Sequence, residues 1–197
     1  MVRVSIAFVL AALIAACSRG EEQAAPGPDA TDTPGPALVA DEVSGTEGSR
    51  AWRYTSVADC QVVREENEEL PEVEMRCDGP AGYSLRVNDS DERIELSIID
   101  PDGSESPLGL TRIGGGGFSS IGDTAEWRGP VGDPFGPDAL IVRYDVAEQP
   151  YPGPETSYLL AIRLGPQPCV VSKIAPGPAQ NAIARRRADD PGACLAD

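Results

Sequence analysis

The sequence predicts a mainly β domain, an antiparallel sheet or sandwich with a C-terminal α-helix and disulfide staples. Three features lead to this prediction. Most apolar segments beyond residue 50 alternate apolar and polar residues, which is the period of a half-buried strand. Turn-forming Gly, Pro, Asp and Asn residues separate these segments. A single stretch near the C-terminus has the composition of a helix.

The predicted strands are segments in which apolar and polar residues take turns. In the first of them, for example, Val73, Met75 and Cys77 alternate with two charged residues. The full set comprises residues 73–77, 83–87, 94–99, 139–146, 157–164 and 169–174. Turn formers such as Asp78-Gly79-Pro80 and Gly165-Pro166 lie between them, so we expect short antiparallel connections.

Three segments between the predicted strands have distinctive compositions. The acidic run 65–69 and the turn 100–105 carry carboxylates, which calcium prefers as ligands. An EF-hand loop needs glycine where this turn has Glu105, so we interpret both segments as solvated and expect no metal site. The glycine-rich segment 114–122 lacks the Gly-Lys-Ser or Gly-Lys-Thr of a phosphate loop. We interpret it as a mobile hairpin loop, with a partner-docking loop as the alternative.

The stretch 180–190 is the one predicted helix. Asn181 is its expected N-cap, Ile183 faces inward, and Arg185-Arg186-Arg187 lie near its end, where positive charges suit the helix dipole. Pro191-Gly192 ends the helix. We interpret the three arginines as structural rather than as a site for lipopolysaccharide or phosphate.

The first 16 residues have the three parts of a secretory signal peptide: a positive start, an apolar run and small residues before a cleavage site. The run of about 13 residues is shorter than the roughly 20 that a membrane-spanning helix needs. Ile14-Ala15-Ala16-Cys17 resembles the lipobox of bacterial lipoproteins. This resemblance implies cleavage before Cys17, diacylglycerol on its sulfur and acylation (palmitate) of its amino group. Ser18, in place of Asp, implies sorting to the outer membrane, facing the periplasm.

The predicted domain organisation has three parts. Residues 1–16 form the signal peptide, and residues 17–50 form a lipidated, disordered tether rich in Pro, Gly and Ala. A tether of this length spans about 30 Å on average, which would hold a domain away from the membrane. Residues 51–197 are long enough for a single soluble β-rich domain.

The four cysteines beyond Cys17 are predicted to form disulfides, because an exported chain with an even number of cysteines favours them. Cys60, Cys77, Cys169 and Cys194 allow three pairings. We prefer the sequential pairing, Cys60 with Cys77 and Cys169 with Cys194, since it closes the shortest loops. A zinc site fails on spacing, because the sequence has neither a Cys-x-x-Cys pair nor a histidine.

The composition restricts both partners and chemistry. The formal net charge of −16 makes nucleic acid an unfavourable partner and leaves cations and basic proteins as candidates. With no histidine in 197 residues, Ser-His-Asp and Cys-His catalysis are excluded. The only lysine, Lys173, directly follows Ser172 and so lacks the Ser-x-x-Lys spacing. We therefore expect no enzyme and no cofactor.

A second resemblance covers most of the domain. It comprises Tyr54-Thr55-Ser56, Cys60, Cys77, Glu126-Trp127-Arg128, the segment 139–144, Cys169-Val170-Val171 and an Asn-Ala-rich helix before Cys194. The succession is similar to uncharacterised alphaproteobacterial envelope proteins. It supports the domain boundaries and implies no activity. We expect a lipid-anchored envelope module that binds or scaffolds an envelope protein. The alternative is an inhibitor of a basic hydrolase such as lysozyme, with the segment 114–122 as its plug.

Overall fold

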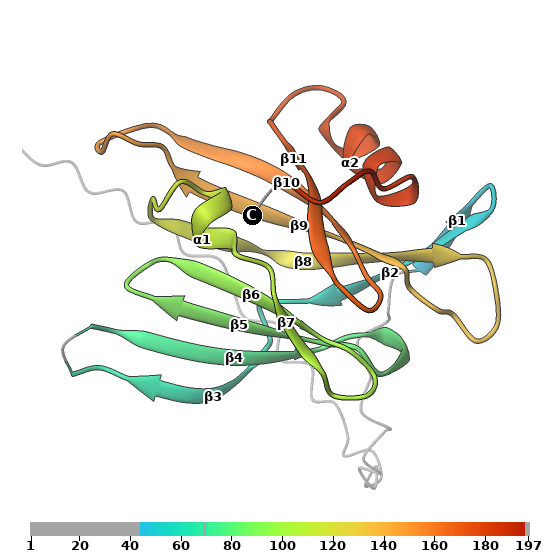
Figure 1. Ribbon diagram of the computed structural model, residues 1–197, viewed down its shortest axis with the longest axis horizontal. Helices are drawn as coiled ribbons and strands as arrows, with labels where there is room; N and C mark the ends of the chain where they lie inside the picture. The colour runs from blue at the N-terminus through green and yellow to red at the C-terminus, as the bar shows by residue number, and fades with distance from the viewer. Residues whose placement is uncertain (1–43, 69, 196–197) are drawn as a thin grey trace, which may run out of the picture. The chain divides into compact units, whose positions relative to one another are not determined.

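The computed structural model describes residues 44–68 and 70–195 of the chain (Figure 1). The chain divides into two units, 1–39 and 40–197, and all described residues belong to the second. The predicted signal peptide 1–16, the lipidation site Cys17 and the predicted tether up to residue 43 therefore lie outside the described residues.

The described residues form two antiparallel sheets, which confirms the predicted fold class (Figure 1). The six strands of sheet A are, in order across the sheet, β1 (Ser44–Glu47), β2 (Arg50–Ser56), β8 (Ser119–Pro130), β9 (Ala139–Ala147), β10 (Glu155–Arg163) and β11 (Cys169–Ile174). The five strands of sheet B are β3 (Gln61–Glu66), β4 (Glu72–Asp78), β5 (Ser84–Ser90), β6 (Ile94–Ile99) and β7 (Glu105–Pro107).

Three helical segments complete the fold. The 3-10 helix η1 (Pro80–Gly82) joins β4 to β5, and the short helix α1 (Leu110–Ile113) precedes β8. Helix α2 (Gln180–Asp189) confirms the predicted C-terminal helix. Within residues 44–68 and 70–195, none of these helices has the length and hydropathy to cross a membrane.

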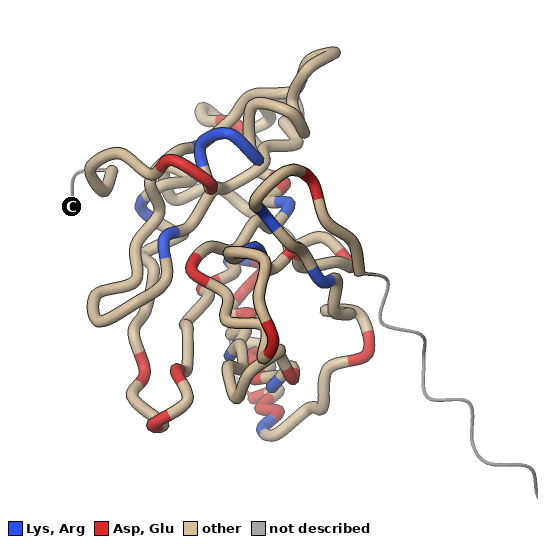
Figure 2. Tube along the Cα trace, turned by 90° about the vertical axis from the view of Figure 1, so that its right-hand side faces the viewer, with Lys and Arg blue, Asp and Glu red and all other residues tan. Residues whose placement is uncertain are grey.

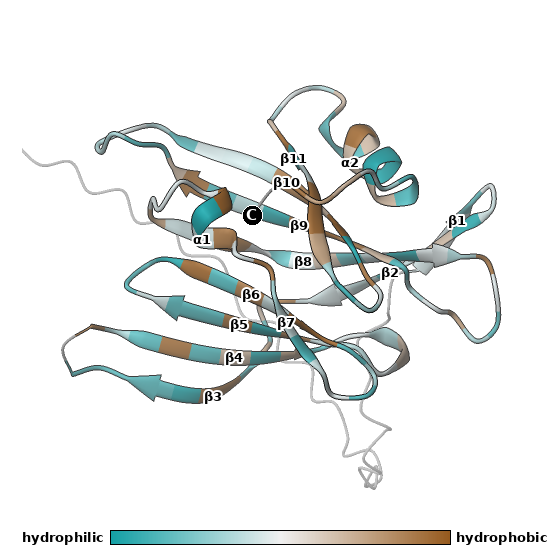
Figure 3. Cartoon of the chain, viewed as in Figure 1, coloured by the Kyte–Doolittle hydropathy of each residue, from teal (hydrophilic) through white to brown (hydrophobic). Residues whose placement is uncertain are grey.

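The main hydrophobic core lies between the two sheets because successive strand residues point to opposite faces. Figure 3 shows this alternation of hydrophobic and hydrophilic residues along β4 and β5. Along β9, Leu140, Val142, Tyr144 and Val146 are fully or almost fully buried in this core. Sheet B contributes Leu85, Val87, Leu96 and Ile98.

A second, smaller core lies on the outer face of sheet A, under α2. The intervening residues of β9 and β10, such as Ile141 and Leu159, pack there against Ala184 and Ala188 of the helix. Small alanine side chains let the helix approach the strands closely. Helix α2 covers only part of this face, and a cavity lies on the uncovered part.

Both predicted disulfides are present. Cys60 pairs with Cys77 at the base of the β3–β4 hairpin, and Cys169 pairs with Cys194 beyond α2. After Cys194, the backbone N–H of Leu195 donates to the carbonyl of Val170 over 2.8 Å. The second disulfide therefore fastens the C-terminal segment to the edge strand β11.

The structure differs from the sequence predictions in three places. The first strand begins at Ser44, ahead of the boundary at residue 51, because β1 and Arg50 pair with the sheet. Asn181 is not the N-cap of α2; Ala179 occupies that position without a side-chain cap. The segment 114–122 is not a hairpin loop, since a turn after α1 leads directly into β8 at Ser119. Gly114 and Gly117 are buried in that turn.

Candidate functional site

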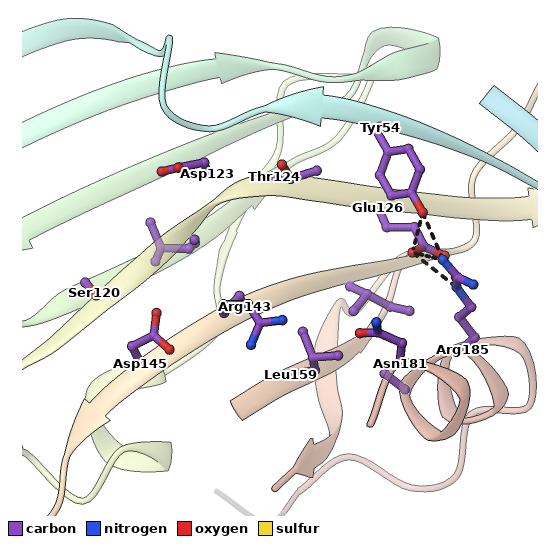
Figure 4. A pocket seen from close by; sticks show the side chains of 14 residues that line it. Tyr54, Ser120, Asp123, Thr124, Glu126, Arg143, Asp145, Leu159, Asn181 and Arg185 are labelled. Atoms are coloured by element: carbon purple, nitrogen blue, oxygen red, sulfur yellow. Dashed lines mark hydrogen bonds and ion pairs between the residues drawn. The ribbon is translucent and has the colours of Figure 1, made fainter. Parts of the chain in front are cut away.

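The candidate site is a trough on the outer face of sheet A, next to the N-terminal half of α2 (Figure 4). Its volume of about 600 Å³ falls within the range of small-molecule sites. Side chains of β2, β8, β9, β10 and α2 line it, and most of them are polar. Ile141, Leu159 and Ala184 supply its apolar part.

A bulge in β8 opens this trough. Ile121 lies opposite Tyr144 and Ala125 lies opposite Val142, so Gly122, Asp123 and Thr124 all face the single residue Arg143. Such an insertion bends the strand and redirects its side chains. The backbone carbonyl of Asp123 is held by the N–H of Val57 over 2.7 Å. The bulge thereby places the Asp123 and Thr124 side chains at the trough.

Glycine is required at position 122 by the close approach of β9. A Cβ atom at this position would lie only 2.7 Å from Cβ of Arg143. Without that atom, Arg143 can pack against the bulge and still line the trough. The position of Arg143 therefore depends on the glycine in the bulge.

One end of the trough is closed by Glu126, Tyr54 and Arg185 (Figure 4). Arg185 of α2 donates from Nε to Oε1 of Glu126 over 2.9 Å and from Nη2 to the Tyr54 hydroxyl over 2.9 Å. The Tyr54 hydroxyl in turn donates to Oε2 of Glu126 over 3.1 Å. Burial, followed by the negative charge of Glu126, raises the pKa of Tyr54, so this hydroxyl keeps its proton at neutral pH.

Behind this end lies a charge network centred on Arg128, whose side chain is 1 % exposed. Arg128 donates from Nη1 to Glu126 over 2.6 Å, and from Nε and Nη2 to the two carboxylate oxygens of Asp189 over 2.8 and 2.7 Å. Arg50 donates to Asp189 over 2.9 Å and forms a two-point contact with Asp138. With Arg185, the network holds three arginines and three carboxylates, so its charges balance.

The network holds Arg128 and Asp189 in their charged forms. Burial alone would lower the pKa of Arg128, but its hydrogen bonds to the carboxylates of Asp189 and Glu126, together with their negative charges, raise it above its ordinary value. Burial alone would raise the pKa of Asp189, but Arg128 and then Arg50 lower it below its ordinary value. The indole ring of Trp52 lies 6.0 Å from both Arg128 and Arg185. This end of the trough is thus rigid and electrically neutral.

The other end carries charges that are not neutralised in this way. Arg143 donates from Nη1 to the Ser157 hydroxyl over 2.6 Å. Within the described residues, Arg143, Asp123 and Asp145 form no ion pair. Arg143 and Asp145 are half-buried, whereas Asp123 is exposed. This contrasts with sheet B, where acidic and basic residues lie close together in the lower part of Figure 2 and pair, as Arg64 does with Glu72.

The groups that line the trough can hold a ligand by charge and by hydrogen bonds. Glu126 accepts hydrogen bonds from Arg128, Arg185 and Tyr54. Over residues 44–68 and 70–195, no three His, Cys, Asp or Glu residues are grouped to hold a metal ion. Arginine and carboxylate groups on apolar walls can recognise a polar ligand that carries both signs of charge.

The predicted site residues lie in different places. The disulfides Cys60–Cys77 and Cys169–Cys194 lie away from the trough, and Cys17 lies outside the described residues. Arg185 has the structural role expected of it, through Glu126. Of the segment 114–122, expected as a plug, residues 119–122 belong to strand β8 and residues 114–118 form the turn before it.

Sequence analysis missed Arg143, Asp145 and Glu126 as site residues. Arg143 and Asp145 interrupt a strand whose other positions are almost all apolar, and both fall on its outer face. That pattern was a usable signal, because a charge amid a buried strand needs either a partner or a ligand. The role of Glu126 depends on contacts with β2 and α2, which its neighbours in sequence do not indicate.

Comparison with known proteins gives no family for this chain. It matches no protein-family model, no curated protein and no solved structure.

Proposed function

We propose that this protein is a lipid-anchored module of the bacterial cell envelope that binds a polar ligand in the trough beside α2, without catalysing its conversion. The observation that carries the binding role is the trough itself: a cavity of about 600 Å³ in which half-buried Arg143 and Asp145 remain without ion pairs. Charges placed in a concave site at a cost in free energy are characteristic of ligand sites.

The closed end of the trough supports the same role. The network around Arg128 fixes Glu126 and Arg185 in one geometry, which lowers the ordering cost of binding a ligand against them. Both groups are already engaged in hydrogen bonds within the network, which favours recognition over catalysis.

The localisation of the protein is proposed from its N-terminal sequence. The lipobox-like Ile14-Ala15-Ala16-Cys17 supports lipid attachment at Cys17, and Ser18 supports the outer membrane, facing the periplasm. The two disulfides are consistent with an oxidising compartment. Two or more acyl chains hold a protein on a membrane, whereas one chain binds only marginally.

The localisation is tested by fractionating bacterial cells that express the wild type or Cys17→Ser, followed by mass spectrometry of the N-terminal peptide. We expect the wild type in the membrane fraction with an acylated peptide beginning at Cys17. The variant should remain uncleaved or become soluble. Membrane retention of a processed Cys17→Ser protein would contradict lipid anchoring.

The binding role is tested separately by NMR. ¹⁵N-labelled protein is titrated with a panel of sugars, diacids, diamines and amino acids, and amide shifts are mapped on the structure. We expect at least one class to shift the amides of Ser120–Thr124 and Arg143–Asp145. A panel that leaves both segments unshifted would contradict the proposed function.

A further inference from the structure

Arg143 and Asp145 form an incomplete charge arrangement at the open end of the trough. They are two positions apart on β9, so both side chains lie on the same face of sheet A. Figure 4 shows them on the β9 wall, with Asp123 on the β8 bulge. One positive and two negative groups therefore line the trough without being paired to each other.

The unused bonding capacity of these groups is large. A guanidinium has five N–H donors, and Arg143 gives one of them to Ser157. Among the described residues, no side chain donates a hydrogen bond to the carboxylate of Asp123 or Asp145. By contrast, other arginines of the same domain, Arg50, Arg64, Arg86, Arg93, Arg128 and Arg185, each form at least one ion pair.

The signs of the lining charges restrict the ligand. A phosphate or a dicarboxylate would meet Arg143 but would be repelled by Asp123 and Asp145. A simple cation would satisfy the carboxylates and leave Arg143 unmatched. A ligand with one carboxylate and one ammonium group satisfies both kinds of charge.

We propose that the trough binds a zwitterion, a free amino acid or a short peptide with free termini. The ligand carboxylate pairs with the guanidinium of Arg143, and its ammonium group lies between Asp145 and Asp123. A planar guanidinium suits a carboxylate because two parallel N–H groups meet its two oxygens. This inference rests on the proposed binding function and adds the chemical class of the ligand.

The remaining lining fits such a ligand. Ile141, Leu159 and Ala184 offer an apolar wall for its side chain, while Thr124 and Asn181 offer hydrogen bonds to a peptide group. The volume of about 600 Å³ exceeds that of a single amino acid and leaves room for a short peptide. Arg185 and Tyr54 close the far end and limit its length.

The test uses ¹⁵N-labelled full-length protein and three probe mixtures in NMR titrations. The first contains free amino acids and dipeptides with each of the twenty residues. The second contains the same compounds N-acetylated, and the third contains them C-amidated. We expect the free compounds to shift the amides of Ser120–Thr124 and Arg143–Asp145, and each blocked mixture to bind about tenfold or more weakly, because one charged hydrogen-bonded pair is lost.

Two variants assign the two ends of the ligand. Arg143→Gln should bind the free and the C-amidated compounds equally, because the guanidinium that pairs with the ligand carboxylate has been removed. Asp145→Asn should lose most of its discrimination against the N-acetylated compounds. Arg76→Gln and Asp78→Asn in sheet B are the matched controls, since Arg76 also donates to a serine hydroxyl, that of Ser84. Both controls should bind like the wild type.

The outcomes separate this inference from the proposed function. Two results would contradict the zwitterionic ligand but leave the binding role in place. In the first, blocked and free compounds bind equally. In the second, only sugars or diacids from the wider panel shift the trough amides. If nothing in the panel shifts those amides, both the zwitterionic ligand and the binding role are wrong. Discrimination that survives in Arg143→Gln and Asp145→Asn would overturn the assigned orientation.

Discussion

Replacing Arg128 by methionine should destabilise the domain through its charge network. The side chain is 1 % exposed and donates three hydrogen bonds to Glu126 and Asp189. Removing one partner of a buried ion pair costs about 3–5 kcal/mol, because the other charge is left uncompensated. Here Asp189 keeps Arg50 and Glu126 keeps Arg185. We therefore expect the lower end, about 3 kcal/mol.

The assay is urea and thermal denaturation, each followed by far-UV circular dichroism. A loss of about 3 kcal/mol corresponds to a decrease of about 6–12 °C in Tm for a domain of this size. Arg64→Met is the control, because Arg64 also pairs with several glutamates but its side chain is 45 % exposed on sheet B. Solvent weakens such pairs, so this variant should unfold at nearly the wild-type urea concentration.

A double variant tests the mechanism. Arg128→Met with Asp189→Leu removes both members of the central pair and leaves two closed pairs, Arg50 with Asp138 and Arg185 with Glu126. The double variant should therefore lose less stability than the sum of its single variants, by about 0.5–3 kcal/mol. The reasoning is refuted if Arg128→Met stays within about 1 kcal/mol of the wild type, or if the two losses simply add.

Three further predictions concern stability. The pKa of Asp189 lies below its ordinary value in the folded protein, so the stabilisation from this carboxylate is present above about pH 4 and is lost as the pH falls through the folded-state pKa. In urea titrations at decreasing pH, the free energy of unfolding should therefore fall less steeply for Asp189→Asn than for the wild type. Equal slopes against pH would contradict this. Cys169→Ala with Cys194→Ala should cost about 3 kcal/mol, since the bridge closes a loop across 25 positions, and an unchanged urea midpoint would count against it. Gly114→Ala should cost about 1–3 kcal/mol, because its Cβ would lie 2.5 Å from the buried Tyr144 hydroxyl, and an unaltered Tm would show that the turn can relax.

The sequence was sufficient for much of the fold. The alternation at 73–77 and 94–98 and the apolar runs at 139–146 and 157–164 mark segments that correspond to β4, β6, β9 and, up to Arg163, β10. These strands were predictable because each buries one face in the core between the sheets, so apolar residues recur at every second position. The disulfide pairing followed from loop length.

The strands β2 and β8 were not predictable in the same way. Their outer faces carry Arg50, Glu126 and Arg128, which are buried by a charge network rather than by apolar contacts. The bulge at Gly122–Thr124 also breaks the alternation of β8. Composition therefore indicated a loop over residues 114–122, of which residues 119–122 form the start of β8.

The trough was not predictable because its parts come from distant segments. Tyr54, Glu126, Arg143 and Arg185 meet only when β2, β8, β9 and α2 are assembled. A charge such as Arg143 within an apolar strand is a local signal, but its free bonding capacity is visible only once its neighbours are known.

The most direct test of the central claim is to identify what the trough holds in cells. The protein is isolated from bacterial envelopes and denatured, and the released small molecules are identified by mass spectrometry. The comparison is with Thr124→Trp, which places a large ring in the trough, and with Thr124→Ala as its control. We predict compounds with both an amine and a carboxylate from the wild type and Thr124→Ala, and their loss from Thr124→Trp. The same compounds in equal amounts from all three proteins would contradict the claim that this trough is the binding site.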